Sequence, residues 1–141
     1  MSQSRLRPSR RPLSVVAAAF LVLVLAACGG QQAESRTLQL ETLNDSGVTG
    51  TAVLTDNGDG TTRVAVDVDA AGHPDMPAHI HPGTCTNLTP QPRYPLQNVI
   101  DGVSETDIDV PLEELFAGGL ALNLHASPDD FETYTACAEL E

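Results

Sequence analysis

The feature that most constrains the fold is a series of short segments in which apolar and polar residues alternate. Residues 63–69 show it best: Val64, Val66 and Val68 alternate with charged or small residues. Successive side chains of a strand point to opposite faces, so this pattern predicts a strand with one buried face. The sequence Asp-Asn-Gly-Asp-Gly at 56–60, just before it, is typical of a hairpin turn.

Similar segments recur along the chain and predict an all-β fold. We expect strands at 37–43, 48–55, 63–69, 78–81, 96–100, 105–110, 120–125 and 134–140. Residues 111–116 predict one or two helical turns, because Pro111 begins them, two acids lie in the first turn, and Gly118 and Gly119 stop them. Many short strands with almost no helix indicate a Greek-key β-sandwich or barrel.

The N-terminus has the features of an export signal. Four basic residues come first: Arg5, Arg7, Arg10 and Arg11. The apolar stretch at 15–27 is shorter than the about 20 residues that a transmembrane helix needs, and it ends in Leu-Ala-Ala-Cys, the pattern of a lipobox. We therefore expect 1–27 to be a lipoprotein signal peptide and Cys28 to be acylated. An ordinary cleaved signal is the alternative, and Sec and Tat export both stay open.

The remaining chain predicts one anchored, acidic domain. Residues 28–36 are small and polar, which predicts a tether, and 37–141 suit one β domain with a modest core. The expected location is extracytoplasmic, on the periplasmic or outer face of the membrane, with lipid as the partner of acylated Cys28. Without the signal, three arginines face nineteen acids and there is no lysine. This charge makes nucleic acid a poor partner.

Two cysteines remain once Cys28 is assigned to lipid. They are Cys85 and Cys137, and two cysteines allow only one intramolecular bridge. Exported proteins commonly carry such bridges, so we expect a disulfide; two free thiols are the alternative.

Three histidines are candidates for metal ligands. His79 and His81 are two apart in a predicted strand, so both rings project from one face, and His125 lies on a distant predicted strand. Imidazole suits copper and zinc, and three nitrogen ligands leave one position open. His73 and Met76, just before the pair, are candidate additional ligands. Histidines that bind nothing are the alternative.

Three segments resemble parts of the copper/zinc superoxide dismutases. Pro-Ala-His-Ile-His-Pro-Gly-Thr-Cys at 77–85 is similar to the segment in which a His-x-His copper pair precedes the disulfide cysteine. Leu-Asn-Leu-His-Ala-Ser-Pro-Asp-Asp at 122–130 resembles the segment with the strand-end copper histidine, and Thr-Ala-Cys-Ala at 135–138 resembles that with the second disulfide cysteine. The chain is also similar to the related CHRD modules. The resemblance implies copper ligands at His79, His81 and His125 and a bridge between Cys85 and Cys137.

Two departures from that family bear on function. Residues 84–94 contain no histidine and no acid, so no zinc site is expected. Tyr134 stands where the family has the arginine that attracts superoxide. We therefore expect a superoxide-dismutase-like protein with a single copper, for copper handling or slow superoxide or redox chemistry, with copper donor or acceptor proteins as candidate partners. An authentic dismutase and a metal-free CHRD-like module are the alternatives.

Overall fold

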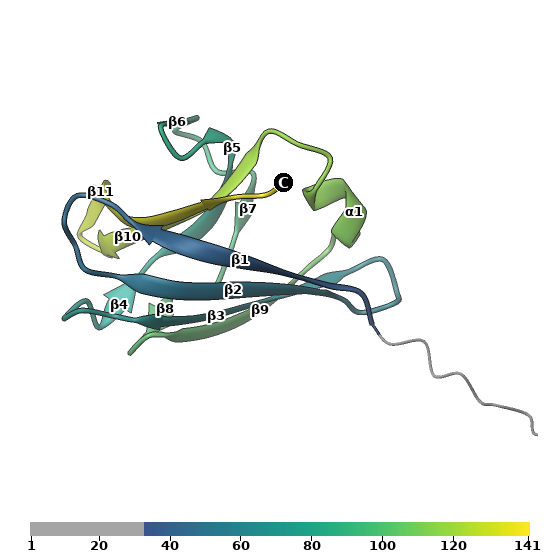
Figure 1. Cartoon of the computed structure of the whole chain (residues 1–141), viewed down its shortest axis with the longest axis horizontal. Coiled ribbons are helices and arrows are strands. Elements are labelled where there is room, and N and C mark those ends of the chain that lie inside the picture. Colours follow the sequence, from purple (N-terminus) through teal and green to yellow (C-terminus); the bar gives the residue numbers. More distant parts are fainter. Residues whose placement is uncertain (1–32) are drawn as a thin grey trace, which may run out of the picture. The chain divides into compact units, whose positions relative to one another are not determined.

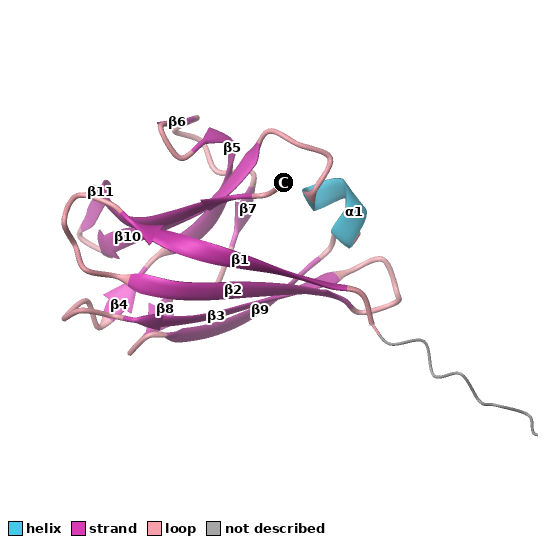
Figure 2. Cartoon of the chain, viewed as in Figure 1, coloured by secondary structure: helices cyan, strands magenta, loops and turns pink. Residues whose placement is uncertain are grey.

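The computed structural model describes residues 33–141, which form one unit whose regular elements are almost all strands (Figure 2). The predicted signal peptide at 1–27 and the predicted lipidation site Cys28 lie outside these residues. No helix within 33–141 is both long and apolar enough to cross a membrane.

The described chain contains eleven strands and one short helix, named in Figure 1. The strands are β1 (Ser35–Thr42), β2 (Thr49–Asp56), β3 (Thr62–Asp69), β4 (Asp75–Met76), β5 (Ala78–Thr84), β6 (Asn87–Leu88), β7 (Tyr94–Pro95), β8 (Val99–Ile100), β9 (Val103–Ile108), β10 (Leu120–Ser127) and β11 (Asp130–Glu139). The helix is α1 (Leu112–Leu115).

The strands form two layers joined by β1 (Figure 1). One layer has the order β4-β8-β9-β3-β2-β1, and the other has the order β1-β11-β10-β5, with β6 and β7 paired to β5. The N-terminal part of β1, up to Leu40, pairs with β2, whereas Glu41 and Thr42 pair with β11. The connections β4–β5 and β9–β10 cross from one layer to the other, as in a Greek-key sandwich.

The alternating apolar residues of both layers meet in one core. Leu54 and Val64 from the first layer and Ile80 and Leu122 from the second are buried there. Leu115 of α1 is also fully buried and closes one end of the sandwich. Burial of these inward faces is the main stabilising contribution, at about 25 cal/mol per Å² of apolar surface.

The predicted all-β sandwich and its helical turn are confirmed, although several boundaries differ. Strand β1 begins at Ser35 rather than 37, and the segment expected at 96–100 is a strand only at Val99–Ile100. Strand β11 begins at Asp130, four residues before the predicted strand. Residues 130–133 lack apolar alternation and are strand because they form a hairpin with the end of β10. Pairing with the neighbouring strand overrides the local pattern here.

Candidate metal centre

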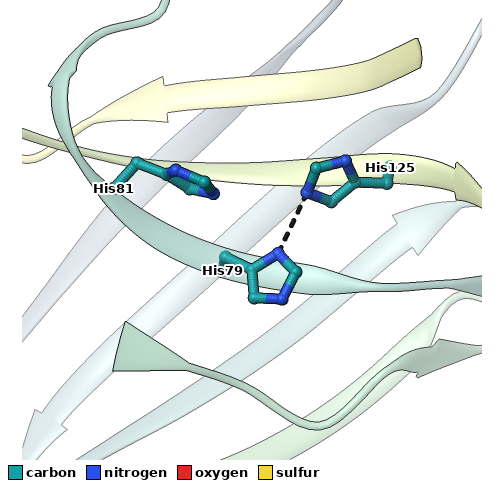
Figure 3. Close-up of side chains that lie close together, drawn as sticks. All are labelled: His79, His81 and His125. Atoms are coloured by element: carbon teal, nitrogen blue, oxygen red, sulfur yellow. Dashed lines mark hydrogen bonds between the residues drawn. The ribbon is translucent and has the colours of Figure 1, made fainter. Parts of the chain in front are cut away.

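Three histidines lie on the outer face of the second layer, away from the core. Strand β5 alternates, so Ala78 and Ile80 enter the core while His79 and His81 face the other way. Strand β10 pairs antiparallel with β5, and its end carries His125 next to the pair. The sandwich thus brings His125 next to two histidines that lie 44 and 46 positions before it, as Figure 3 shows.

The ring nitrogens of the three histidines converge. One nitrogen from each ring lies within 4.8 Å of those of the other two, and Nδ1 of His79 is 2.9 Å from Nε2 of His125 (Figure 3). Metal–nitrogen bonds are about 2.0–2.1 Å long, so small side-chain movements allow all three nitrogens to bind one ion.

Backbone carbonyls fix which nitrogen is available on two of the rings. Nδ1 of His81 donates to the carbonyl of Thr89 at 2.7 Å, and Nδ1 of His125 donates to the carbonyl of Phe131 at the same distance. Their Nε2 atoms therefore carry lone pairs. Within residues 33–141, the buried Nε2 of His81 has no hydrogen-bond partner. Such outer hydrogen bonds are typical of metal-binding histidines, and an unpartnered buried nitrogen fits a ligand atom.

A β-bulge positions His125. The register between β10 and β11 shifts between Leu124, which pairs with Ala136, and His125, which pairs with Tyr134. The backbone N–H of His125 donates to the carbonyl of Pro77 at 2.9 Å, which continues the pairing toward β5. Bulges change the direction of a side chain at the end of a ladder, and this one holds the His125 ring beside His79.

The environment keeps two of the rings neutral. Burial, together with the nearby rings of His125 and His81, lowers the pKa of His79 to about 4. Burial also lowers the pKa of His125, although the carbonyl of Phe131 opposes this effect. Neutral imidazole is the form that binds metals, so these ligands need not lose a proton near pH 7.

An open pocket of about 470 Å³ lies over the cluster. Besides the three histidines, its lining is mainly proline and aromatic: Pro90, Pro92, Phe131, Glu132 and Tyr134. The Tyr134 ring packs against His125 with its centroid 5.1 Å away. The pocket therefore has one carboxylate and no cationic side chain among the described residues that line it.

The two further ligand candidates lie elsewhere. Met76 is fully buried, and its sulfur accepts a hydrogen bond from Thr135 at 3.6 Å. His73 lines a different surface pocket beside Asp69 and Asp101 and is bonded to the carbonyl of Ala126. The structure does not bring either residue to the cluster. Met76 lies on β4, which pairs with β8 of the first layer, and its side chain enters the core there; residue spacing does not reveal this pairing.

A disulfide joins Cys85, just after β5, to Cys137 on β11, as predicted. It attaches the start of the segment that contains Thr89 and Pro90 to the sheet. The carbonyls of Thr89 and Phe131 are functional groups that sequence reasoning missed, because a backbone acceptor has no signature in the residue pattern. A disulfide also fits an oxidising compartment.

The fold and the cluster define a class: an antiparallel β-sandwich with three histidines placed to hold one metal ion on its outer face. No protein-family model and no curated protein matches this chain. Solved structures of superoxide dismutase 5 from Candida albicans do match. One mutant form is 24% identical, with a TM-score of 0.56 over 74% of this chain and 89% of that one. Another is 22% identical, with a TM-score of 0.52 over 77% and 88%. The chain thus has a superoxide-dismutase-like fold, and the resemblance is confirmed at that level.

Proposed function

We propose that this protein binds a single copper ion through His79, His81 and His125. The observation that carries the proposal is the convergence of three ring nitrogens within 4.8 Å, two of them fixed as acceptors by hydrogen bonds on the other side of the ring. Three imidazoles fit copper or zinc, and copper binds nitrogen sites more tightly than zinc does. The similar fold of a superoxide dismutase supports the same choice.

Copper handling or slow redox chemistry outside the cytoplasm is the proposed role. A bound copper ion can pass between Cu(I) and Cu(II) and so exchange one electron. The protein residues hold the ion, and Phe131 and Tyr134 cover the rings beside the pocket. The open pocket admits a small molecule or the loop of a copper donor or acceptor protein.

The charges do not favour fast dismutation of superoxide. The arginines of the described chain are engaged elsewhere: Arg36 with Glu34, Arg63 with Asp107 and Arg93 with Glu114. Glu132 is the charged residue of the pocket lining. An anion approaching this site is repelled, whereas a cationic guide raises association rates by about 10-fold or more.

Copper titration followed by thermal unfolding tests the proposal. A ligand at about 100 times its dissociation constant adds about 2.7 kcal/mol to the free energy of unfolding, which raises the melting temperature clearly. We expect this rise with Cu(I) or Cu(II) in the wild type and its loss in the combined His79→Ala, His81→Ala, His125→Ala variant. His73→Ala is the matched control, because that histidine lies outside the cluster. If neither copper ion moves the melting temperature of the wild type, the protein is a metal-free module like the CHRD domains.

A substitution at Tyr134 distinguishes copper handling from dismutation. Tyr134→Arg places a cation in the pocket, and Tyr134→Gln is the neutral control. If the copper-loaded protein reacts with superoxide, the arginine variant should react faster at low salt, by about 10-fold, and lose the gain at high salt. A wild type that already reacts at rates typical of steered association would identify an authentic dismutase instead.

We also propose that Cys28 anchors the domain to the membrane as an acylated lipoprotein. The lipobox pattern before Cys28 supports this, and the disulfide of the domain fits an extracytoplasmic location. Labelling with a fatty-acid analogue should mark the wild type and not Cys28→Ala. Equal labelling of both proteins would contradict the anchor.

A further inference from the structure

A fully buried asparagine lies behind the histidine cluster. Asn123 is on β10 between Leu122 and Leu124, which enter the core, so its side chain lies on the same outer face as the histidines. Its cross-strand partners are His79 on β5 and Cys137 on β11, and it has no exposed surface. It is the polar exception in the segment Leu-Ala-Leu-Asn-Leu at 120–124.

The amide of Asn123 is incompletely bonded where it lies. Its Nδ2 donates to Nε2 of His125 at 3.3 Å. Its Oδ1 is buried and has no hydrogen-bond partner among residues 33–141. An unmet buried acceptor costs about 1–3 kcal/mol, and a valine or leucine would fill this strand position without that cost. The hydrogen bonds of this structure therefore do not explain why a buried amide occupies position 123.

We propose that Asn123 supplies its carboxamide oxygen as a fourth ligand to the ion held by the three histidines. This inference rests on the proposed copper site. Two ligands about 2.0–2.1 Å from a tetrahedral ion lie about 3.3–3.4 Å apart. The amide nitrogen of Asn123 is 3.3 Å from Nε2 of His125, which is that separation.

A half-turn of the amide exchanges its nitrogen and oxygen at almost no cost in shape. Without the ion, the single lone pair of His125 Nε2 faces Nδ1 of His79 at 2.9 Å and, at the longer distance of 3.3 Å, the NH₂ group of Asn123. When that lone pair binds the ion, the NH₂ group loses its acceptor, and the oxygen is the end of the amide that a cation attracts. Amide oxygen is a known weak ligand of copper, and as a hard donor it favours Cu(II) over Cu(I).

Asn123→Leu tests the inference, since leucine has a similar volume and no donor. The measurements are the affinities for Cu(II) and Cu(I), by competition with chelators, and the electron paramagnetic resonance spectrum of the Cu(II) form. We expect a loss of Cu(II) affinity of about 10-fold or more, with little change for Cu(I). A tenfold fall in the ratio of Cu(II) affinity to Cu(I) affinity raises the reduction potential of the bound copper by about 59 mV. Asn123→Asp, which keeps an oxygen, should retain Cu(II) affinity.

A direct measurement on the wild type keeps the inference testable if the leucine variant fails to fold. Protein grown with asparagine labelled with ¹³C in the carboxamide should show a carbon hyperfine coupling to Cu(II) characteristic of a bound oxygen. His73→Ala, with the same label, should show it too, because that residue lies outside the cluster.

The outcomes separate the two proposals. If the wild type binds copper through the histidines but shows no such coupling, and Asn123→Leu has the wild-type ratio of affinities, the fourth-ligand inference is wrong and the copper site stands. If the combined histidine variant binds copper as well as the wild type, the copper site itself is wrong and this inference fails with it.

Discussion

Removal of the disulfide should destabilise the domain strongly and leave the histidine site nearly intact. The bridge between Cys85 and Cys137 closes a segment of 52 residues that includes β10, His125 and most of the pocket lining. In the folded protein the bridge joins elements that other bonds also hold, since the backbone N–H of Cys85 donates to Oε1 of Glu139 on β11 at 3.0 Å and β10 pairs with both β5 and β11. Its main effect is therefore on the unfolded chain.

The loop length gives the magnitude. In the chain-entropy model a closed loop of 52 residues lowers the entropy of the unfolded state by about 14 cal/mol/K, which is about 4 kcal/mol at 25 °C. For a domain of this size, 1 kcal/mol corresponds to about 4 °C, so the melting temperature of Cys85→Ala/Cys137→Ala should fall by about 15–20 °C.

Urea unfolding of the wild type, the double variant and the chemically reduced wild type measures this loss. Reduction removes the bond without removing side-chain atoms from the buried Cys137, so it controls for lost packing. The free energy of unfolding should fall more steeply with urea concentration in both bond-free forms, because their unfolded chains expose more surface. The copper affinity of Cys85→Ala/Cys137→Ala, which leaves no free thiol at the bridge, should change by less than about 10-fold, because β6 and the Thr89 N–H keep the loop on β5. A loss of stability below about 1 kcal/mol would refute the entropic reasoning.

Three further predictions concern pH, backbone and core. In the metal-free protein His79 titrates near pH 4 when folded and near 6.5 when unfolded, so the unfolded state binds more protons between these values. The free energy of unfolding of the wild type should fall as the pH drops from 6.5 to 4, and that of His79→Gln should fall less steeply. The same dependence on pH in both proteins would contradict this prediction. Gly83 has φ +118°, and an added Cβ would clash with the backbone carbonyl of Asn87, so Gly83→Ala should cost about 2 kcal/mol or more in urea unfolding. Gly118→Ala, with open space around it, should cost less. Leu54→Ala, at a fully buried position, should cost about 3–5 kcal/mol by the same measurement, and a loss under 1 kcal/mol would show that the core collapses around it.

The pattern of residues in the sequence was sufficient to predict the fold class and to select the three histidines. Alternation at 63–69 and the turn at 56–60 are local signals, and β2 and β3 form the hairpin they predict. The spacing of His79 and His81 places both rings on one face of any strand, whatever surrounds it. The start of β11 and the short strands β4, β6 and β7 are set by pairing with other strands and not by an apolar pattern of their own, so local pattern did not predict them.

Only the tertiary structure decided which donors surround the site. Met76 and His73 precede the histidine pair closely in sequence, yet Met76 pairs with β8 and enters the core, whereas His73 lines a separate pocket. Asn123 and the carbonyls of Thr89 and Phe131 come to the cluster through cross-strand pairing and a bulge. The physical reason is that a strand specifies only the face of each side chain. Which side chains become neighbours on that face depends on the register between strands, and a one-residue shift in register changes every neighbour.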